Sequence, residues 1–373
     1  MELKSPAFFR ILAYAGVYVG AVIGAGYASG QEILQFFAGY GYIGLVGALI
    51  TTILLAWYGA VFMELGHRLK TNSHKVVCRY LCGNLLGGLA DYVLLFFMFG
   101  MITIMISGGG AAMEQYYGWD PMIGKLIIAF VTFLTVFSGF SSALKTLGFI
   151  TPVMVIGVLI ISMITIGQNY GKLTNLDETL AIIKPATASN FWWFAAIIYV
   201  SYNVVPGVST FASLGNAEKN VLVARSAGIV GGLTLGICIL FITIAIFSNL
   251  AEIASYQIPF LEIAKQINYT SGLLFSILLL AAVYTTAVSN LYGMGIRFFD
   301  AGSAKFRLMV FVVIIAAVLA SMFPFNQLVG TVYPALGVLG LVVMACAFYK
   351  TITGEVFSDK VEKKRLALLA KKS

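Results

Sequence analysis

The chain has 373 residues, of which 60% are hydrophobic and only 10% are charged, and its mean hydropathy is +0.95. These values exclude a soluble globular domain and indicate an all-α polytopic membrane protein. The net charge of +8 does not indicate a nucleic-acid partner, because the basic residues flank apolar segments or fill the C-terminal end. The four cysteines are too few and too scattered to staple a chain of this size, so we expect free thiols at Cys78, Cys82, Cys238 and Cys346.

Long apolar segments predict ten transmembrane helices, because about 20 apolar residues are needed to cross a bilayer core of about 30 Å. The first segment is longer than the apolar core of a signal peptide, so we expect it to remain as a span. Two shorter stretches, Ser73–Leu81 and Pro259–Gln266, are predicted to be helices that do not span. The ten predicted spans are approximately Phe9–Phe37, Tyr42–Leu65, Leu85–Met113, Met122–Phe140, Leu147–Ile166, Phe191–Leu214, Val221–Leu250, Gly272–Ile296, Phe306–Phe323 and Gln327–Phe348.

The distribution of Lys and Arg predicts that both termini are cytoplasmic. With the N-terminus inside, nineteen basic residues fall on the inner side and four, Lys125, Lys172, Lys184 and Lys265, fall on the outer side. We therefore expect a multi-pass protein of the cell membrane with a basic cytoplasmic tail at residues 353–373. Contact of this tail with membrane lipid is expected.

The first predicted span is unusual because it carries the glycine-rich run VYVGAVIGAGYASGQE at residues 17–32. Glycine costs about 1 kcal/mol relative to alanine in a helix interior, and the run Gly24–Gly26 favours a break in the helix. The alternative is close helix packing, because Gly16, Gly20 and Gly24 recur every four residues. A broken backbone at membrane depth is tolerated only where it lines a cavity or is buried in protein.

The sixth predicted span contains a second candidate break. Its middle, Ser201–Gly207, combines polar side chains with Pro206-Gly207, and proline removes a backbone donor and clashes with the preceding turn. A simple kink is the alternative. Each break lies in the first span of a set of five spans. Because five is an odd number, the second set enters the membrane from the opposite face. The sequence therefore predicts one domain of two inverted five-helix repeats, at about residues 8–168 and 190–350.

The pattern resembles the leucine-transporter fold of the amino acid–polyamine–organocation superfamily. The run IGAGYASGQEILQFF from Ile23 to Phe37 is similar to the YkvI-type family of bacterial membrane proteins, which are candidate amino-acid permeases. The resemblance implies that spans one and six unwind to hold a substrate and that a sodium ion bridges spans one and eight. It implies no second sodium site, because Tyr27 stands where such a site has Asn. The arginine that gates the outer vestibule in the sodium-symporter branch of this fold is absent here, and Gly30 stands near its expected place.

The substrate site that the resemblance implies has two ends. Amides around Gly24, Ala25, Gly26 and Tyr27 would receive a carboxylate at the positive end of a half-helix. Carbonyl groups freed near the second break would receive an ammonium group. The residues of that second end are Val200, Ser201, Tyr202 and Asn203.

The sodium site that the resemblance implies joins spans one and eight. Thr285 and Thr286 would supply hydroxyl oxygens, and carbonyl oxygens would come from Gly20, Ile23 and Ala282. Both threonines have an alternative role, because hydroxyl groups in membrane helices commonly bond to carbonyls one turn back. No cofactor is expected apart from this bound sodium ion.

Glu32 is the ionisable residue of greatest interest, because it lies inside the first span, where charges are functional candidates. It is a candidate proton-coupling group or a residue of the outer vestibule, and the alternative is simple solvation near the outer interface. Glu64, His67, Asp91 and Glu218 lie near cytoplasmic ends, where solvated or structural roles are expected. Trp192 and Trp193 are expected in the aromatic belt, with a quaternary ammonium cage as the alternative.

The function that these features favour is secondary active symport of a small zwitterionic solute, an amino acid, with sodium favoured over protons as the coupling ion. The alternative is a channel or passive facilitator lined by the same broken helices. An enzyme is not expected, because the sequence shows no spacing typical of metal ligands or of a nucleophile and its base.

Overall fold

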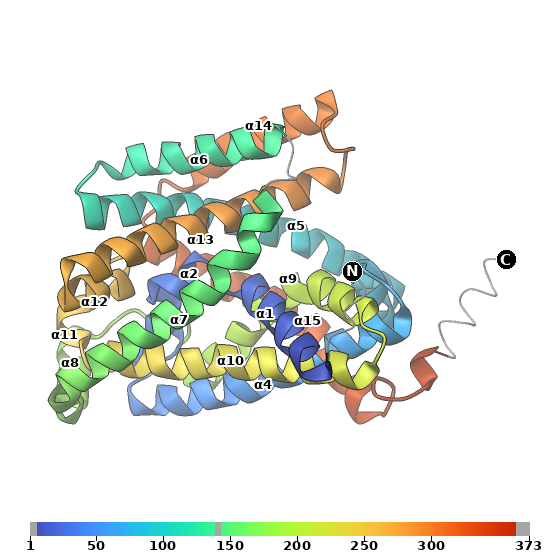
Figure 1. Ribbon diagram of the computed structural model, residues 1–373, viewed down its shortest axis with the longest axis horizontal. Coiled ribbons are helices and arrows are strands. Elements are labelled where there is room, and N and C mark those ends of the chain that lie inside the picture. The colour runs from blue at the N-terminus through green and yellow to red at the C-terminus, as the bar shows by residue number, and fades with distance from the viewer. Residues whose placement is uncertain (1–5, 139–142, 363–373) are drawn as a thin grey trace.

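The computed structural model describes residues 6–138 and 143–362, and within these residues every regular element is a helix. The long helices run side by side along the long axis of the molecule (Figure 1). In chain order the helices are α1 (Ala7–Val22), α2 (Ala25–Ser29), α3 (Gln31–Phe36), η1 (Ala38–Tyr40), α4 (Tyr42–Leu69), α5 (His74–Tyr117), α6 (Pro121–Ser138), α7 (Ala143–Asn169), η3 (Tyr170–Asn175), α8 (Leu176–Ile183), α9 (Trp192–Ala217), α10 (Val221–Phe247), α11 (Leu250–Ile253), α12 (Pro259–Ile267), α13 (Tyr269–Ile296), α14 (Ala304–Ala320) and α15 (Phe325–Ile352).

The ten predicted spans each correspond to helix in the part of the chain that the structure describes. Eight helical segments are long and apolar enough to cross a bilayer. The two remaining predicted spans are the first, which is divided among α1, α2 and α3, and the ninth, which is the 17-residue α14. The end of the fourth predicted span, Phe140, lies outside the described residues. A count of ten therefore fits the structure.

The two short helices predicted beside the spans are also present. Pro259–Gln266 corresponds to α12, and Ser73–Leu81 corresponds to the first part of α5. The backbone leaves the helical conformation at Gly83, where φ is +78° and ψ is −177°. Glycine adopts this positive φ without the steric cost that other residues carry, so the chain turns here between the short segment and the span.

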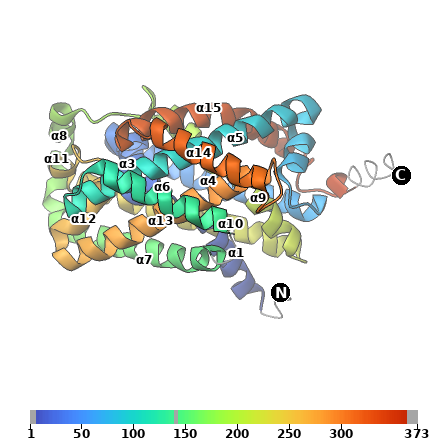
Figure 2. The same cartoon turned by 90° about the horizontal axis from the view of Figure 1, so that it is seen from above.

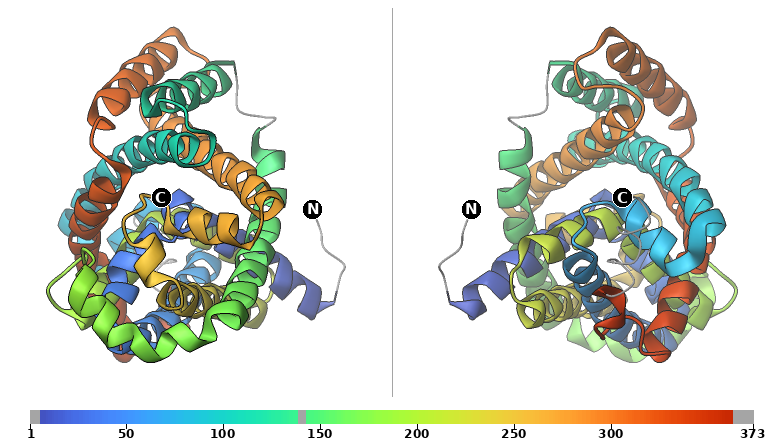
Figure 3. Two further views of the ribbon diagram at one scale, coloured as in Figure 1. Left: turned by 90° about the vertical axis from the view of Figure 1, so that its left-hand side faces the viewer. Right: turned by 90° about the vertical axis from the view of Figure 1, so that its right-hand side faces the viewer.

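The helices form two groups. One contains α1, α4, α9 and α10, in which α4 contacts both α9 and α10. The other contains α5 and α13, over which α6 and α14 lie as an outer pair (Figure 2 and Figure 3). Close contact between α4 and α10 depends on small residues, since a Cβ atom built on Gly232 would lie 2.3 Å from the backbone nitrogen of Ala56.

Charged pairs gather at the end of the molecule where α4 ends and α10 begins. Arg225 binds the buried Glu64 with Nε and Oε2 2.7 Å apart, and Arg10 binds Glu218 at 2.8 Å. The ring of His67 bonds to the backbone oxygen of Glu218. These residues were expected near cytoplasmic ends, and the structure gives them paired, structural roles.

Candidate functional site

The first span breaks between α1 and α2. The backbone of Ile23 and of Gly24 is extended, with ψ of 103° and −173°, and the helix resumes at Ala25. Gly24 lies beside two other elements, because a Cβ atom built on it would be 3.9 Å from the side chains of Met101 in α5 and Thr286 in α13. The break was predicted at Gly24–Gly26, and it lies one residue earlier, with Gly26 already inside α2.

A second interruption follows at Gly30, where φ is +77°. This left-handed residue separates α2 from α3, and glycine adopts such a φ without steric cost. Glu32, in the first turn of α3, folds back over α2. A Cβ atom built on Gly26 would lie only 1.8 Å from Oε1 of Glu32, so the carboxyl group occupies the space that a side chain at position 26 would need.

Glu32 is buried, with only 3% of its surface exposed. Its Oε2 accepts a hydrogen bond of 2.6 Å from the hydroxyl group of Tyr202 in α9. The alternative that Glu32 is simply solvated near the outer interface is therefore wrong, because its side chain is buried inside the protein. Its roles in proton coupling and in the outer approach stay predictions. The carboxyl group lies beside the break in the first span.

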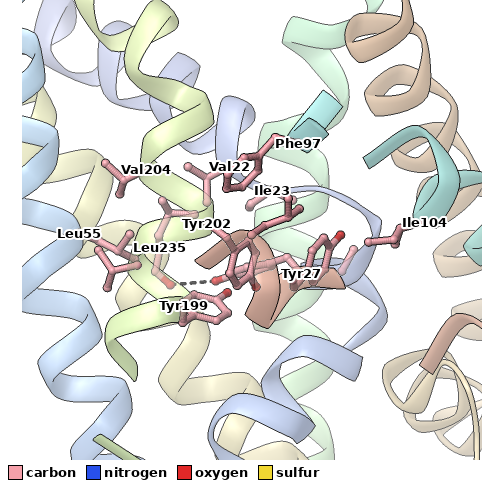
Figure 4. Packing of buried hydrophobic residues seen from close by; sticks show 14 of the residues in the cluster. Val22, Ile23, Tyr27, Leu55, Phe97, Ile104, Tyr199, Tyr202, Val204 and Leu235 are labelled. Carbon is pink, nitrogen blue, oxygen red and sulfur yellow. Dashed lines mark hydrogen bonds between the residues drawn. The ribbon is translucent and has the colours of Figure 1, made fainter. Parts of the chain in front are cut away.

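Four aromatic rings surround this carboxyl group. The rings of Tyr202 and Tyr333 are stacked with centroids 4.6 Å apart, and Tyr199 meets Tyr202 at 5.2 Å. Phe36 packs against both Tyr199 and Tyr202. Tyr199 and Tyr202 lie together in the middle of the helix bundle, close to Tyr27 (Figure 4). Glu32, Tyr199, Tyr202 and Tyr333 are called the Glu32 cluster below.

Two hydroxyl groups of the Glu32 cluster are unsatisfied. The hydroxyl oxygens of Tyr199 and Tyr333 are buried and lie close to the carboxyl group of Glu32, but neither makes a hydrogen bond of ordinary geometry. Buried polar atoms are nearly always paired with protein or with a bound molecule. The cluster therefore holds polar groups that a bound solute or water can satisfy.

The sixth span is not interrupted as predicted. Helix α9 continues from Trp192 to Ala217 with Pro206 inside it, so the expected set of freed carbonyls near Val200–Asn203 is corrected. Proline removes only the hydrogen bond to the carbonyl four residues earlier, which is that of Tyr202. The Asn203 side chain reinforces the preceding turn by donating to the carbonyl of Tyr199 at 2.9 Å.

The structure also places the remaining predicted substrate residues. Val200 is fully buried, and the hydroxyl group of Ser201 donates to the carbonyl of Gly337 in α15. Tyr27 donates to the carbonyl of Leu235 in α10. Ala25 begins α2, where the first amides have no partner within the helix. Tyr199, Tyr333 and Met101 were not predicted.

The residues predicted for sodium come from the end of α1, where Gly20 and Ile23 lie, and from α13, which holds Ala282, Thr285 and Thr286. Thr286 faces Gly24, while Gly20 is half-buried near the end of α1 and Ile23 is buried at the break. The hydroxyl group of Thr285 donates to the carbonyl of Ala282 at 3.1 Å. This bond to a carbonyl one turn back is the alternative to sodium binding that the sequence left open for Thr285. A hydroxyl oxygen that donates one hydrogen bond keeps its lone pairs for a cation.

The sequence also raises expectations for the cysteines, the metal-ligating residue types and the tryptophans. All four cysteines are unpaired. Within residues 6–138 and 143–362, no three His, Cys, Asp or Glu side chains are grouped as metal ligands. Trp193 is 47% exposed and stacks on Phe191, as expected of a residue in an aromatic belt.

Known proteins resemble the chain both in sequence and in fold. No protein-family model matches it. It is 25% identical over 336 residues to the uncharacterized membrane protein YkvI of Bacillus subtilis (strain 168), covering 90% of this chain and 94% of that relative. It is also 25% identical over 331 residues to the uncharacterized protein YyaD of the same organism, covering 88% and 93% of the two chains.

Solved structures of transporters share the fold. MhsT in complex with L-phenylalanine gives a TM-score of 0.61 at 14% identity and covers 96% of this chain and 97% of its own. The manganese transporter of Eremococcus coleocola gives 0.62 at 12% identity, covering 92% and 79%. A Na+-coupled sialic acid symporter gives 0.56 at 14% identity, covering 92% and 78%. The chain is therefore a homologue of YkvI and YyaD and a multi-pass membrane protein with the leucine-transporter fold.

Proposed function

We propose that this protein is a secondary active transporter that moves a small zwitterionic solute, an amino acid, together with a cation, and that sodium is favoured over protons as that cation. The observation that carries the proposal is the break of the first span at Ile23–Gly24, in the interior of the bundle and beside Thr286. Interrupted backbone at membrane depth is tolerated where it is buried in protein or lines a cavity.

The fold supports the proposal because solved structures that share it are titled as a manganese transporter and as a Na+-coupled sialic acid symporter. A third, MhsT, is a complex with L-phenylalanine. Alternating access would come from movement of one helix group against the other around the break. We also propose that the protein lies in the cell membrane with both termini cytoplasmic, on the basis of its nineteen inner and four outer basic residues.

Reconstitution into sealed proteoliposomes tests this function. A thermal-shift screen with the twenty common amino acids, with and without sodium, first selects the solute. Uptake of that radiolabelled solute is then measured with an inward sodium gradient, with an inward proton gradient and with neither. Symport predicts accumulation above the external concentration only when a gradient is present, whereas flux that stops at equal concentrations contradicts it.

The coupling ion is tested with threonine variants. Thr285→Ala and Thr286→Ala are expected to weaken the dependence of uptake on sodium, because each removes a candidate ligand oxygen. Thr243→Ala is the matched control, since its buried hydroxyl group in α10 bonds to a carbonyl one turn back in the same way. Unchanged sodium dependence in both α13 variants would contradict the sodium site.

A further inference from the structure

Glu32 differs from the other buried acidic residues in having no basic partner. Glu64 binds Arg225, Glu218 binds Arg10, and Asp91 binds Arg297. Within the described part of the chain, no Lys, Arg or His side chain pairs with Glu32, and only tyrosines interact with its carboxyl group. A buried carboxylate without a counter-charge is costly, so Glu32 either holds a proton or pairs with a cation that the chain itself does not supply.

The hydrogen-bonding capacity of the Glu32 cluster is also incomplete. Tyr202 donates to Glu32, which fixes the carboxyl group between α3 and α9. The hydroxyl oxygens of Tyr199 and Tyr333 are fully buried and unpartnered. The cluster thus offers one carboxylate and two phenol oxygens whose lone pairs are not used by any donor, and all of these groups accept hydrogen bonds.

We propose that the Glu32 cluster binds the ammonium group of the transported solute. A primary ammonium group has three N–H donors and a positive charge, which match one carboxylate and two phenol oxygens. The surrounding aromatic rings add a favourable interaction with a cation. The inference rests on the proposed function and deepens it: it defines the solute class as amines, and it replaces the backbone carbonyls of α9 as the expected ammonium site.

The same arrangement disfavours a solute that carries only a carboxylate. Because Oε1 of Glu32 lies against Gly26, a carboxylate at the first amides of α2 would meet a like charge at short range. A solute with an ammonium group neutralises Glu32 first. An amine without a carboxylate is therefore expected to bind, and an acid without an amine is not.

The experiment uses the purified full-length protein in detergent and three sets of matched compounds. The sets are L-alanine, ethylamine and propionate; L-leucine, 3-methylbutylamine and 4-methylpentanoate; and L-phenylalanine, 2-phenylethylamine and 3-phenylpropionate. Ligand-dependent thermal stabilisation gives the affinity of each compound, because binding to the folded state raises the apparent melting temperature. The expected result is stabilisation by the amino acid and the amine of at least one set, without stabilisation by the acid.

Variants assign the effect to the cluster. Glu32→Gln is expected to weaken amine binding by at least about thirtyfold, because it removes one partner of a buried charge pair. Tyr199→Phe and Tyr333→Phe are expected to weaken it several-fold and keep the assignment testable if Glu32→Gln does not fold. Tyr18→Phe is the control, since it removes a buried tyrosine hydroxyl that donates to the carbonyl of Leu55 and not to Glu32.

Three results would overturn the inference: acids that stabilise as well as amines, amine affinity unchanged in Glu32→Gln and in both tyrosine variants, or no stabilisation by any amine. These results are distinct from failure of the proposed function. Amine binding without gradient-driven accumulation would contradict symport and leave the amine site intact. Accumulation of a solute that lacks an amine would support transport and overturn the amine site.

Discussion

The position of Glu32 against Gly26 makes Gly26→Ala a sharp test of the site geometry. Alanine suits the helical backbone of α2 and by propensity alone would stabilise it by about 1 kcal/mol. The added methyl group, however, would lie 1.8 Å from Oε1 and 2.7 Å from Cδ of Glu32. The carboxyl group must move, which strains the packing by about 1–3 kcal/mol and breaks its bond to Tyr202, worth about 1.5–3 kcal/mol.

A double-mutant cycle isolates this contact. Together these contributions predict that Gly26→Ala lowers the free energy of unfolding by about 1.5–5 kcal/mol in the native protein and is neutral or stabilising in the Glu32→Ala background. The assay is reversible denaturation in detergent micelles, or the shift in apparent melting temperature where unfolding is irreversible. Gly16→Ala is the control, because nothing lies within 4 Å of its added Cβ atom. Equal effects of Gly26→Ala in both backgrounds would refute the proposed approach of Glu32 to α2.

Three further outcomes follow from the packing and the charges. Gly232→Ala is expected to lower the melting temperature strongly, because its Cβ would lie 2.3 Å from the α4 backbone. Gly88→Ala is the control, because open space surrounds its added Cβ atom. Equal melting temperatures of the two variants would contradict the contact between α4 and α10. Glu64→Gln leaves Arg225 without its buried partner and is expected to cost about 3 kcal/mol in denaturation; a loss below about 1 kcal/mol would show that the pair is solvated. Thr285→Ala is expected to lower sodium-dependent uptake while leaving the protein folded, as judged by gel filtration; uptake at the native sodium dependence would remove this residue from the ion site.

The spans could be predicted from the sequence because the bilayer imposes a fixed length of apolar residues. The same reasoning located the break in the first span but placed it one residue late. Gly24 and Gly26 look alike in sequence, yet Gly24 is extended at the break whereas Gly26 is helical and makes room for Glu32. Glycine serves both unwinding and close approach, and only the surrounding atoms show which use applies.

The sixth span shows why proline is a weaker signal. Pro206 removes one backbone donor, but α9 stays continuous because its neighbours hold it on several sides and Asn203 reinforces the preceding turn. The outcome depends on packing from α4 and α15, which no local pattern reveals.

The Glu32 cluster could be found only in part from sequence. Glu32 was recognisable as a charge inside a span, and Tyr199 precedes Tyr202 by three residues, which places both on one helix face. Tyr333 comes from α15 and stacks on Tyr202 through tertiary packing alone. The sequence shows that a buried acid such as Glu32 needs a partner. It does not show which aromatic residues from distant helices pack around that acid.

Secondary active transport requires that a cation gradient drives the solute through this protein. The most direct measurement is the ratio of internal to external solute at steady state in sealed proteoliposomes, with the sodium gradient imposed and then collapsed by an ionophore. Sodium-driven symport predicts a ratio above one that falls to one when the gradient collapses. A ratio that stays at one throughout, with saturable flux, would contradict secondary active transport and indicate a passive facilitator.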